Sequence, residues 1–445
     1  MRRTFVVALE NQHVGDPLGD ENISMEEEAL MIDEADQSAQ EVNQDLGDAE
    51  RIVQVAESLE DLAVVAGSKE ELSPHEAHLM EKAGDMAVAG TDVEPDEIVP
   101  AMESFKGADG KISGKLAMEN FKETASRLWE NIKRILKEVW SKIEAFFYKI
   151  FGTIPSQRRK LKDLAARVSE ANSKTRENAK FTIASNRYMV AGTTAIKTGA
   201  AYESALKEFV ATSKWVFGTY TSGLKADGEK IAKALEDFDA EKPAEATDQL
   251  ASALGGGQAK VPGGKAAGGS RWPKHKVEQG HDLLGGVSLF TISPEKGEGG
   301  ALARLEQLRQ AQCELAPSSE KAKDNSSTVE FTTLGQPEAS SMIKDCEAIL
   351  DAMEDYQRGK AKGEIQATKK KIEAASGKAE TAAGKAKASD DATEKAAVPH
   401  YRALINFNVS YARWVQSPVI PFTKLAFGVI NTTRNLIERS LTQYK

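Results

Sequence analysis

The chain has 445 residues, of which 40% are apolar and 28% charged, with two cysteines and a formal charge of −10. This length allows two or three ordinary domains, and two cysteines exclude a disulfide framework. No stretch reaches the ~18 uninterrupted apolar residues of a membrane-spanning helix, and the short apolar run that ends at Glu10 is too brief for a secretory signal peptide.

The charge changes sign near residue 103. Residues 1–103 carry 27 acidic and 5 basic side chains, a net charge of −22, whereas residues 104–445 carry 41 acidic and 53 basic side chains, a net charge of +12. The two parts should attract each other while they are joined, and their separation would leave a cationic remainder.

The acidic N-terminal segment, residues 1–103, is predicted to be disordered or weakly helical. Apolar residues at helical spacing over 48–66 predict one modest helix. Ser73, Pro74 and Glu76 have the residue types of an N-cap, a first helical position and a third helical position. They predict a second helix from Pro74 to about residue 89.

Residues 104–119 contain glycines that alternate with lysines, which predicts a flexible linker. A near-repeat surrounds this linker, because Ala101-Met102-Glu103-Ser104-Phe105 recurs as Ala117-Met118-Glu119-Asn120-Phe121. One interpretation is proteolytic processing after Glu103 and Glu119, since an extended backbone is plausible at both. The other is ordinary helix-start composition, since Ala-x-Glu occurs eight times in the chain.

The strongest periodic pattern predicts an amphipathic helix over 120–154, which Gly152 and Pro155 should stop. Lysines and arginines occupy much of its other side, and an i,i+4 ion pair between Glu138 and Lys142 is predicted. Two interpretations remain open for the apolar face: the core of a bundle that packs on residues 399–445, or a membrane interface. That face contains Phe121, Leu128, Trp129, Ile132, Leu136, Val139, Trp140, Ile143 and Phe147.

The remaining chain predicts a helical body divided by a glycine-rich segment. Residues 120–240 are predicted to be helical, with breaks at Gly218 and Gly223, and residues 241–300 to be a linker or loop with a lone strand at 287–292. Residues 301–445 are predicted to be helical with an apolar C-terminal segment, in which Pro418 and Pro421 kink or divide the chain. The fold class is therefore mostly α, an elongated bundle of long amphipathic helices. The Ala/Lys/Gly run at 369–387 is helix-permissive but has too few large apolar groups for a core position.

No motif predicts catalysis, a cofactor or a metal. Gly263-Gly264-Lys265 lacks the preceding glycine and the following Ser or Thr of a phosphate-binding loop. His75 and His78 are three residues apart, whereas a zinc-protease helix places its histidines four apart. We expect a protein that is not an enzyme.

The acidic segment, the two Ala-Met-Glu motifs and the basic helical body together resemble the internal head proteins (inner-body or ejected virion proteins) of large tailed bacteriophages. The resemblance implies a propeptide that enters the prohead with the scaffold and that the prohead protease removes after small-x-Glu motifs. It also implies assembly in the host cytoplasm and residence in the capsid interior, beside other internal head proteins and packaged DNA. Contact with DNA would be weak and non-specific. Ejection into the host, with membrane contact afterwards, is a further expectation.

Two other functions fit the same sequence. A membrane-active helical protein or toxin could be kept soluble by an acidic pro-segment, and its target would then be lipid rather than DNA. A bacterial helical adaptor that is never cut would keep its intact N-terminus. Lipid binding, DNA retention and the N-terminus of the native protein distinguish these alternatives.

Overall fold

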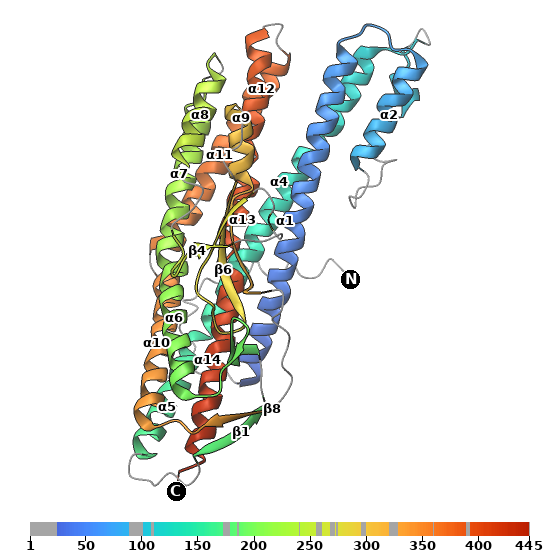
Figure 1. The fold of residues 1–445 in the computed structure, drawn as a ribbon. Coiled ribbons are helices and arrows are strands. Elements are labelled where there is room, and N and C mark those ends of the chain that lie inside the picture. Colours follow the sequence, from blue (N-terminus) through green and yellow to red (C-terminus); the bar gives the residue numbers. More distant parts are fainter. Residues whose placement is uncertain are drawn as a thin grey trace. The chain divides into compact units, whose positions relative to one another are not determined.

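The computed structural model describes residues 25–88, 101–107, 111–171, 179–184, 187–239, 241–254, 260–267, 272, 275–294, 300–319, 328–358, 360–388 and 392–444. Helices dominate these residues, so the predicted mostly α fold is confirmed (Figure 1). The chain forms two compact units, one of residues 37–144 and one of residues 145–445 together with the start of α1 up to Asp36.

The unit of residues 37–144 contains α1 (Met25–Gly67), α2 (Pro74–Val88), the short 3-10 helix η1 (Met102–Phe105) and most of α4 (Gly114–Gly152). Helix α1 includes the predicted helix at 48–66, but it also includes residues 25–47, where composition favoured disorder or weak helix. Its buried side chains explain this length, because their spacing alternates between four and three residues, as in a coiled-coil seam. They are Val42, Leu46, Ala49, Val53 and Ala56.

Helix α4 begins earlier than the sequence pattern predicts. Ser113 acts as its N-cap, since the Leu116 N–H donates to Ser113 Oγ at 3.3 Å, so residues 114–119 are helical and not part of a flexible linker. Gly152 ends the helix as predicted. Pro155 does not act as a stop, because it lies in the first turn of α5 (Ile154–Glu170), where its missing N–H costs no helical hydrogen bond.

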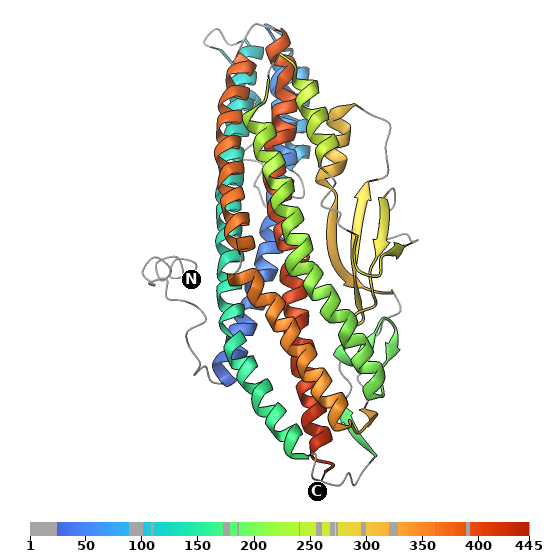
Figure 2. The same cartoon turned by 90° about the vertical axis from the view of Figure 1, so that its left-hand side faces the viewer.

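The unit that contains residues 145–445 is built around a long helical rod. Helix α6 (Gly199–Lys214), the π-helical turn η4 (Trp215–Tyr220) and α7 (Thr221–Glu236) follow one another without a break. Figures 1 and 2 show α6 and α7 in line. The predicted breaks at Gly218 and Gly223 are therefore wrong: Gly218 lies within the π-helical turn, which accommodates an extra residue without ending the helix, and Gly223 lies within α7.

Two further helices pack along this rod. Helix α10 (Gln336–Arg358) packs on α6 and on α5, and α11 (Lys360–Ala388) packs on α7. The Ala/Lys/Gly run at 369–387 lies in α11 and contributes to the core, contrary to the sequence prediction, because Ile372, Ala375 and Ala379 are buried. Small side chains let two helices approach closely where large ones would hold them apart. Helix α12 (Ala392–Ile405) follows α11 along the chain.

The apolar C-terminal segment forms the end of α12, α13 (Phe407–Gln416) and α14 (Val419–Leu441). Pro418 separates α13 from α14 as predicted, whereas Pro421 lies in the first turn of α14 and divides nothing. Aromatic side chains of this C-terminal segment lie in the core. The ring of Phe422 on α14 stacks with that of Phe209 on α6, with centroids 4.9 Å apart. The Tyr220 hydroxyl donates to the carbonyl oxygens of Trp414 and Ser417, both at 2.9 Å, so the corner between α13 and α14 is tied to the rod.

A small sheet lies beside the rod, as both ribbon views show (Figures 1 and 2). Strands β4 (Lys265–Ala266), β5 (His275–Gln279), β6 (Val287–Pro294) and β7 (Gln312–Pro317) pair antiparallel in that order. The strand predicted at 287–292 is thus confirmed as β6, but it is not alone. Side chains on both faces of β6 are buried, including Leu289 and Phe290, which explains its nearly continuous apolar run.

The structure differs from the sequence prediction in two ways in the middle of the chain. Residues 241–300 contain α8 (Pro243–Ala253) and the strands β4 to β6 where glycine content predicted a linker or loop. Further strands occur at β1 (Lys180–Ala184) and β8 (Thr328–Thr332), which pair antiparallel with Phe181 opposite Phe331, and at the short pair β2 (Val190–Ala191) and β3 (Thr194–Ala195). The short helices η3 (Arg187–Met189) and α9 (Ala301–Arg309) complete the described elements, and α9 matches the helix predicted from residue 301.

Both cysteines are free and buried. Burial raises the pKa of the Cys346 thiol to about 12 and raises the pKa of Cys313 further above its ordinary value. These two thiols are structural side chains of the core, in keeping with a chain that has no disulfide framework.

Candidate functional site

The first copy of the near-repeat lies in a short exposed turn. Residues 102–105 form η1, in which the Ser104 N–H donates to the Ala101 carbonyl at 2.9 Å and the Lys106 N–H donates to the Glu103 carbonyl at 3.2 Å. Glu103 and Ser104 are exposed, whereas Phe105 is fully buried. Only one helical turn has to open for the Glu103–Ser104 bond to become extended, as a protease substrate must be.

The second copy lies within a regular helix. Ala117 to Asn120 occupy the first turns of α4, where the Ala117 N–H donates to the Ser113 carbonyl at 3.1 Å. The Thr124 hydroxyl donates to the Asn120 carbonyl at 3.0 Å, and the Ala117 side chain is buried. The Glu119–Asn120 bond can become extended only if the start of α4 unwinds.

The two copies contact each other at equivalent positions. The Asn120 side-chain amide donates to the carbonyl and to the hydroxyl oxygen of Ser104, both at 3.0 Å, and the rings of Phe105 and Phe121 lie 5.5 Å apart. The chain between them is also held, since the Ser113 N–H donates to the Phe105 carbonyl at 2.8 Å. The described residues of 104–113 therefore form a docked turn and not the flexible linker that their composition predicts.

Acidic residues of the leader, defined here as residues 1–103, pair with basic residues of α4 and of the turn before it. Lys142 lies 2.6 Å from Asp45 and 3.2 Å from Glu41, and Lys111 pairs with Glu71. Burial by itself lowers the pKa of Lys142, but the hydrogen bonds and charges of Asp45 and Glu41 outweigh it, so the pKa is raised. Lys142 forms these contacts instead of the predicted i,i+4 pair with Glu138.

Hydrogen bonds outside these ion pairs also join the leader to the start and middle of α4. The Trp129 indole N–H donates to Glu60 at 3.2 Å. The Leu72 N–H donates to the Ile112 carbonyl at 2.9 Å, and the Gly114 N–H donates to the Glu70 carbonyl at 3.1 Å. The described residues of the leader are thus joined to α4 and to the turn before it by hydrogen bonds and ion pairs.

The apolar face predicted for α4 is almost entirely covered. Trp129 is half-buried, and the other predicted members of the face are buried: Phe121, Leu128, Ile132, Leu136, Val139, Trp140, Ile143 and Phe147. At the C-terminal end of the helix, the ring of Phe147 lies 5.4 Å from that of Phe151 and 5.4 Å from that of Tyr356 on α10. The face is buried in the fold, whereas its packing on residues 399–445, as the bundle-core interpretation has it, stays a prediction. No described helix is both long enough and apolar enough to cross a bilayer.

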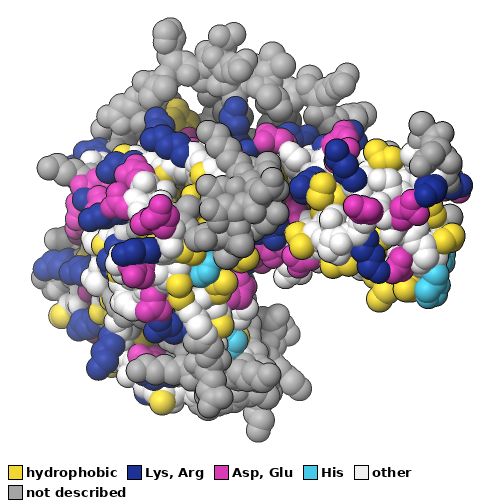
Figure 3. Space-filling view, turned by 90° about the horizontal axis from the view of Figure 1, so that it is seen from above, with side chains coloured by type: hydrophobic (Ala, Val, Ile, Leu, Met, Phe, Trp, Pro, Cys, Tyr) yellow, Lys and Arg dark blue, Asp and Glu magenta, His cyan; other side chains and the backbone are white. Residues whose placement is uncertain are grey.

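Surface charge does not segregate on the face that Figure 3 draws, where basic and acidic side chains of the described residues are interspersed. Several of them form pairs within one helix, such as Glu123 with Arg127 at 2.5 Å and Glu130 with Lys133 at 2.7 Å. Such exposed pairs each contribute at most about 1 kcal/mol.

Within the described residues, no cluster of three or more His, Cys, Asp or Glu side chains is placed to hold a metal ion. His78 lies 3.5 Å from Glu81 on the same helix. Gly263 and Gly264 belong to the turn before β4, where the Gly264 N–H donates to the Val261 carbonyl at 2.9 Å. His78 and Gly264 thus take part in local contacts within the fold.

A comparison with models of protein families gives one match, phiKZ-like phage internal head proteins, over residues 27–438. The chain belongs to this family. No curated protein and no solved structure matches it. The match confirms the resemblance that the acidic leader, the Ala-Met-Glu motifs and the helical body carry.

For a phage internal head protein, the expected location is the interior of the capsid. The family match begins inside α1 and continues through α2 and η1 into the body. The acidic leader is therefore part of what this chain shares with other phiKZ-like internal head proteins, and is not an unrelated extension.

A third candidate for processing escaped the search for Ala-x-Glu. Ser68-Lys69-Glu70 fits the pattern that the family resemblance implies, and these residues lie exposed in the loop between α1 and α2. The less restrictive pattern, applied to the loops between predicted helices, could have found it.

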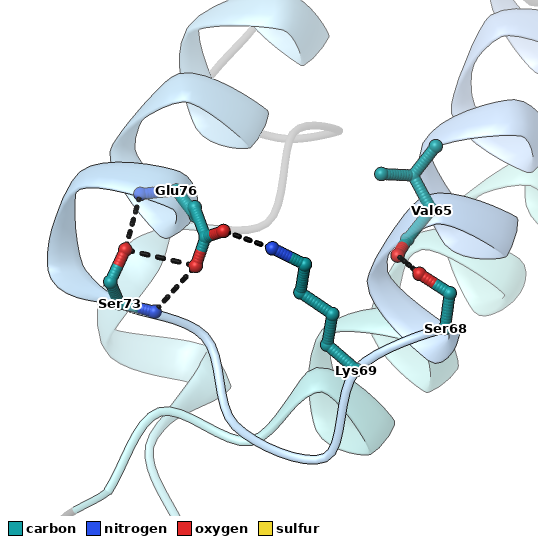
Figure 4. Close-up of polar contacts among 5 residues, drawn as sticks. All are labelled: Val65, Ser68, Lys69, Ser73 and Glu76. Atoms are coloured by element: carbon teal, nitrogen blue, oxygen red, sulfur yellow. Dashed lines mark hydrogen bonds and ion pairs between the residues drawn. The ribbon is translucent and has the colours of Figure 1, made fainter.

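The loop that carries this third sequence ends in a capping box, as Ser73 and Glu76 predict (Figure 4). The Glu76 N–H donates to Ser73 Oγ at 3.3 Å, and Glu76 Oε2 accepts from the Ser73 N–H at 2.9 Å. Glu76 also pairs with Lys69. Hydrogen bonds from Lys69 and Ser73 lower the pKa of Glu76 to about 2.

Proposed function

We propose that this internal head protein enters the prohead with its acidic leader attached, is cut after Glu103, and remains as a cationic helical body beside packaged DNA. The role is structural and not enzymatic. Its partners during assembly in the host cytoplasm would be the prohead scaffold, the prohead protease and other internal head proteins. The observation that carries the proposal is the Ala101-Met102-Glu103-Ser104 turn, in which Glu103 and Ser104 are exposed and which lies where the charge of the chain changes sign.

The geometry of the two motifs supports Glu103 over Glu119 as the processed site. At Glu103 the bonds to be broken are those of a single 3-10 turn and the two hydrogen bonds from Asn120 to Ser104. At Glu119 the bond lies in a helix of 39 residues whose start is capped by Ser113. Since exposed turns are cut far more readily than hydrogen-bonded helix, the Glu103–Ser104 bond is the better substrate.

The leader supports the proposal as an internal competitor for the basic body. Its carboxylates Asp45, Glu41 and Glu71 already neutralise two lysines of residues 104–144. Once the leader has left, the body carries +12. This charge is spread over many residues, so contact with DNA should be independent of sequence and should weaken steeply with salt.

The direct test is the N-terminus of the protein extracted from mature phage heads, read by N-terminal sequencing and intact mass. A start at Ser104 is expected. A start at Asn120 would contradict the choice of bond, and a start at Met1 would contradict processing altogether.

A second test measures binding to duplex DNA and to anionic lipid vesicles. It compares the processed protein purified from heads with the full-length chain. The processed form should retain duplex DNA at low salt more strongly than the full-length chain, and the difference should fall as salt rises. Anionic lipid vesicles provide the control surface. If the processed form disrupts vesicles but does not retain DNA, the membrane-active alternative replaces this proposal.

A further inference from the structure

We infer that the Glu103–Ser104 bond is cut first and the Glu119–Asn120 bond is protected, because the first copy of the near-repeat, docked on the second, keeps the latter bond inside a helix. Processing would then stop at Ser104. This inference rests on the proposed function, since it concerns the regulation of the same segment.

The docking contacts lie on the body side of the Glu103–Ser104 bond. Asn120 holds the carbonyl and hydroxyl oxygens of Ser104, and Phe105 packs on Phe121. The contacts that cross the bond are a separate group: the Ser104 N–H and hydroxyl donate to the Ala101 carbonyl, and the Lys106 N–H donates to the Glu103 carbonyl. A cut after Glu103 removes only the second group, so the new N-terminal residue stays attached to α4.

The docked turn also stabilises the start of α4. The Phe105 carbonyl accepts from the N–H of Ser113, and Ser113 in turn caps the helix through Leu116. The main chains of Lys106 and Ile112 pair as well, which closes the turn in front of the helix. Opening the Glu119 bond therefore requires the loss of the cap, of the first turns of α4 and of the Phe105–Phe121 contact together.

The order can be tested on the full-length recombinant chain with a glutamate-specific endoprotease, which cuts after glutamate and needs no phage motif. Fragments that begin at Ser104 and at Asn120 are quantified by mass spectrometry over time. When local opening is fast, each initial rate reports how often its bond is exposed. In the wild-type chain the Ser104 fragment should form at least about ten times faster than the Asn120 fragment.

Two variants outside the 117–120 motif should weaken the protection. Ser113→Ala removes the cap of α4 and should raise the rate of the Asn120 fragment about fivefold. Phe105→Ala removes the docked ring and should raise it by at least as much, whereas Phe105→Leu should keep most of the protection. Lys115→Ala, an exposed position in the same helical turn, is the matched control and should change neither rate.

Equal initial rates at the two bonds in the wild-type chain, or rates unaffected by Ser113→Ala and Phe105→Ala, would overturn the inference. Circular dichroism establishes that each variant keeps its helix content, and if Phe105→Ala unfolds, Ser113→Ala alone decides. The outcome is separate from that of the proposed function. A Met1 start in phage heads would remove processing but not the measured order, whereas equal rates would remove the order but not processing.

Discussion

Asn120 holds Ser104 through two hydrogen bonds of 3.0 Å from its side-chain amide, although the two residues are 16 positions apart. They occupy the same place in the two copies of the near-repeat, and the phenylalanines that follow them also pack together. The repetition in the sequence therefore corresponds to a contact in the fold, which joins the end of the leader to the start of the body.

Replacing Asn120 with alanine should loosen this contact without unfolding the chain. Each lost hydrogen bond lies at the surface, so the free energy of unfolding should fall by about 1 kcal/mol in total. Amide hydrogen exchange should become faster at the described residues of 104–113 and stay unchanged in α14. Lys122→Ala, two residues away on the same helix, is the control. Unchanged exchange in Asn120→Ala would show that the Ser104 contact has no stabilising role.

The capping box at the start of α2 should make the stability of the chain depend on pH. The pKa of Glu76 is about 2 in the fold and lies near its ordinary value of 4.5 in the unfolded chain, so its ionised form stabilises the fold. That contribution is fully present above pH 4.5 and is lost as the pH falls toward 2. The stability difference between wild type and Glu76→Gln, measured by urea unfolding, should shrink over this interval. Glu70→Gln, in the same loop but outside the capping box, is the control variant.

Gly228 marks the closest approach of α7 to its neighbours. A Cβ placed there would lie 2.4 Å from Thr368 Cγ2 and 2.7 Å from the ring of Tyr411. Gly228→Ala should therefore destabilise the chain by about 1–3 kcal/mol. Gly377→Ala on α11 is the matched control, because nothing lies within 4 Å of its Cβ position. That substitution should be neutral or should stabilise by up to about 1 kcal/mol. Equal thermal shifts for the two variants would contradict this account of the helix contact.

A cut after Glu103 should not by itself release the leader. Leu59 is fully buried on α1, beside the Glu60 that accepts from Trp129, so the leader should remain bound to α4 without a covalent link. A specific protease site inserted between Glu103 and Ser104 permits a single cut, after which both fragments should elute together in size-exclusion chromatography.

Leu59→Asp should separate the two fragments, because an unpaired buried charge costs at least about 3 kcal/mol. Val64→Asp, on the same helix with Val64 67% exposed, should leave them together. Separation of the wild-type fragments under native conditions would mean that the cut alone completes release. Retention would mean that a further event, such as a cut in the exposed Ser68-Lys69-Glu70 loop, is needed.

The local pattern of the sequence predicted much of the fold. Apolar residues at helical spacing identified α4 and most of its buried face, and Ser73, Pro74 and Glu76 identified the start of α2, because capping and amphipathicity depend on neighbouring residues. The charge boundary at residue 103 and the near-repeat were also visible, and they led to the family that the comparison confirmed.

Long-range contacts decided the rest. Composition assigned residues 25–47 to weak helix or disorder, residues 104–119 to a linker and residues 369–387 to a non-core position, because each is rich in charged or small residues. In the fold, residues 25–47 are part of a long helix with a regular buried seam. The described residues of 104–119 are held by Asn120, Phe121 and the Ser113 cap. Residues 369–387 pack closely on α7. Strand β6 was found from its β-branched and aromatic residues, but its partners β5 and β7 were not, since pairing joins residues far apart in the chain.

The sequence alone determined where the charge reverses, which segments are strongly amphipathic and where the two Ala-Met-Glu motifs stand. Only the tertiary structure decided that the motifs differ, one in an exposed turn and the other in a capped helix, and that their equivalent residues touch. The physical reason is that residue types set local preferences, whereas exposure and protection of a peptide bond depend on what packs against it.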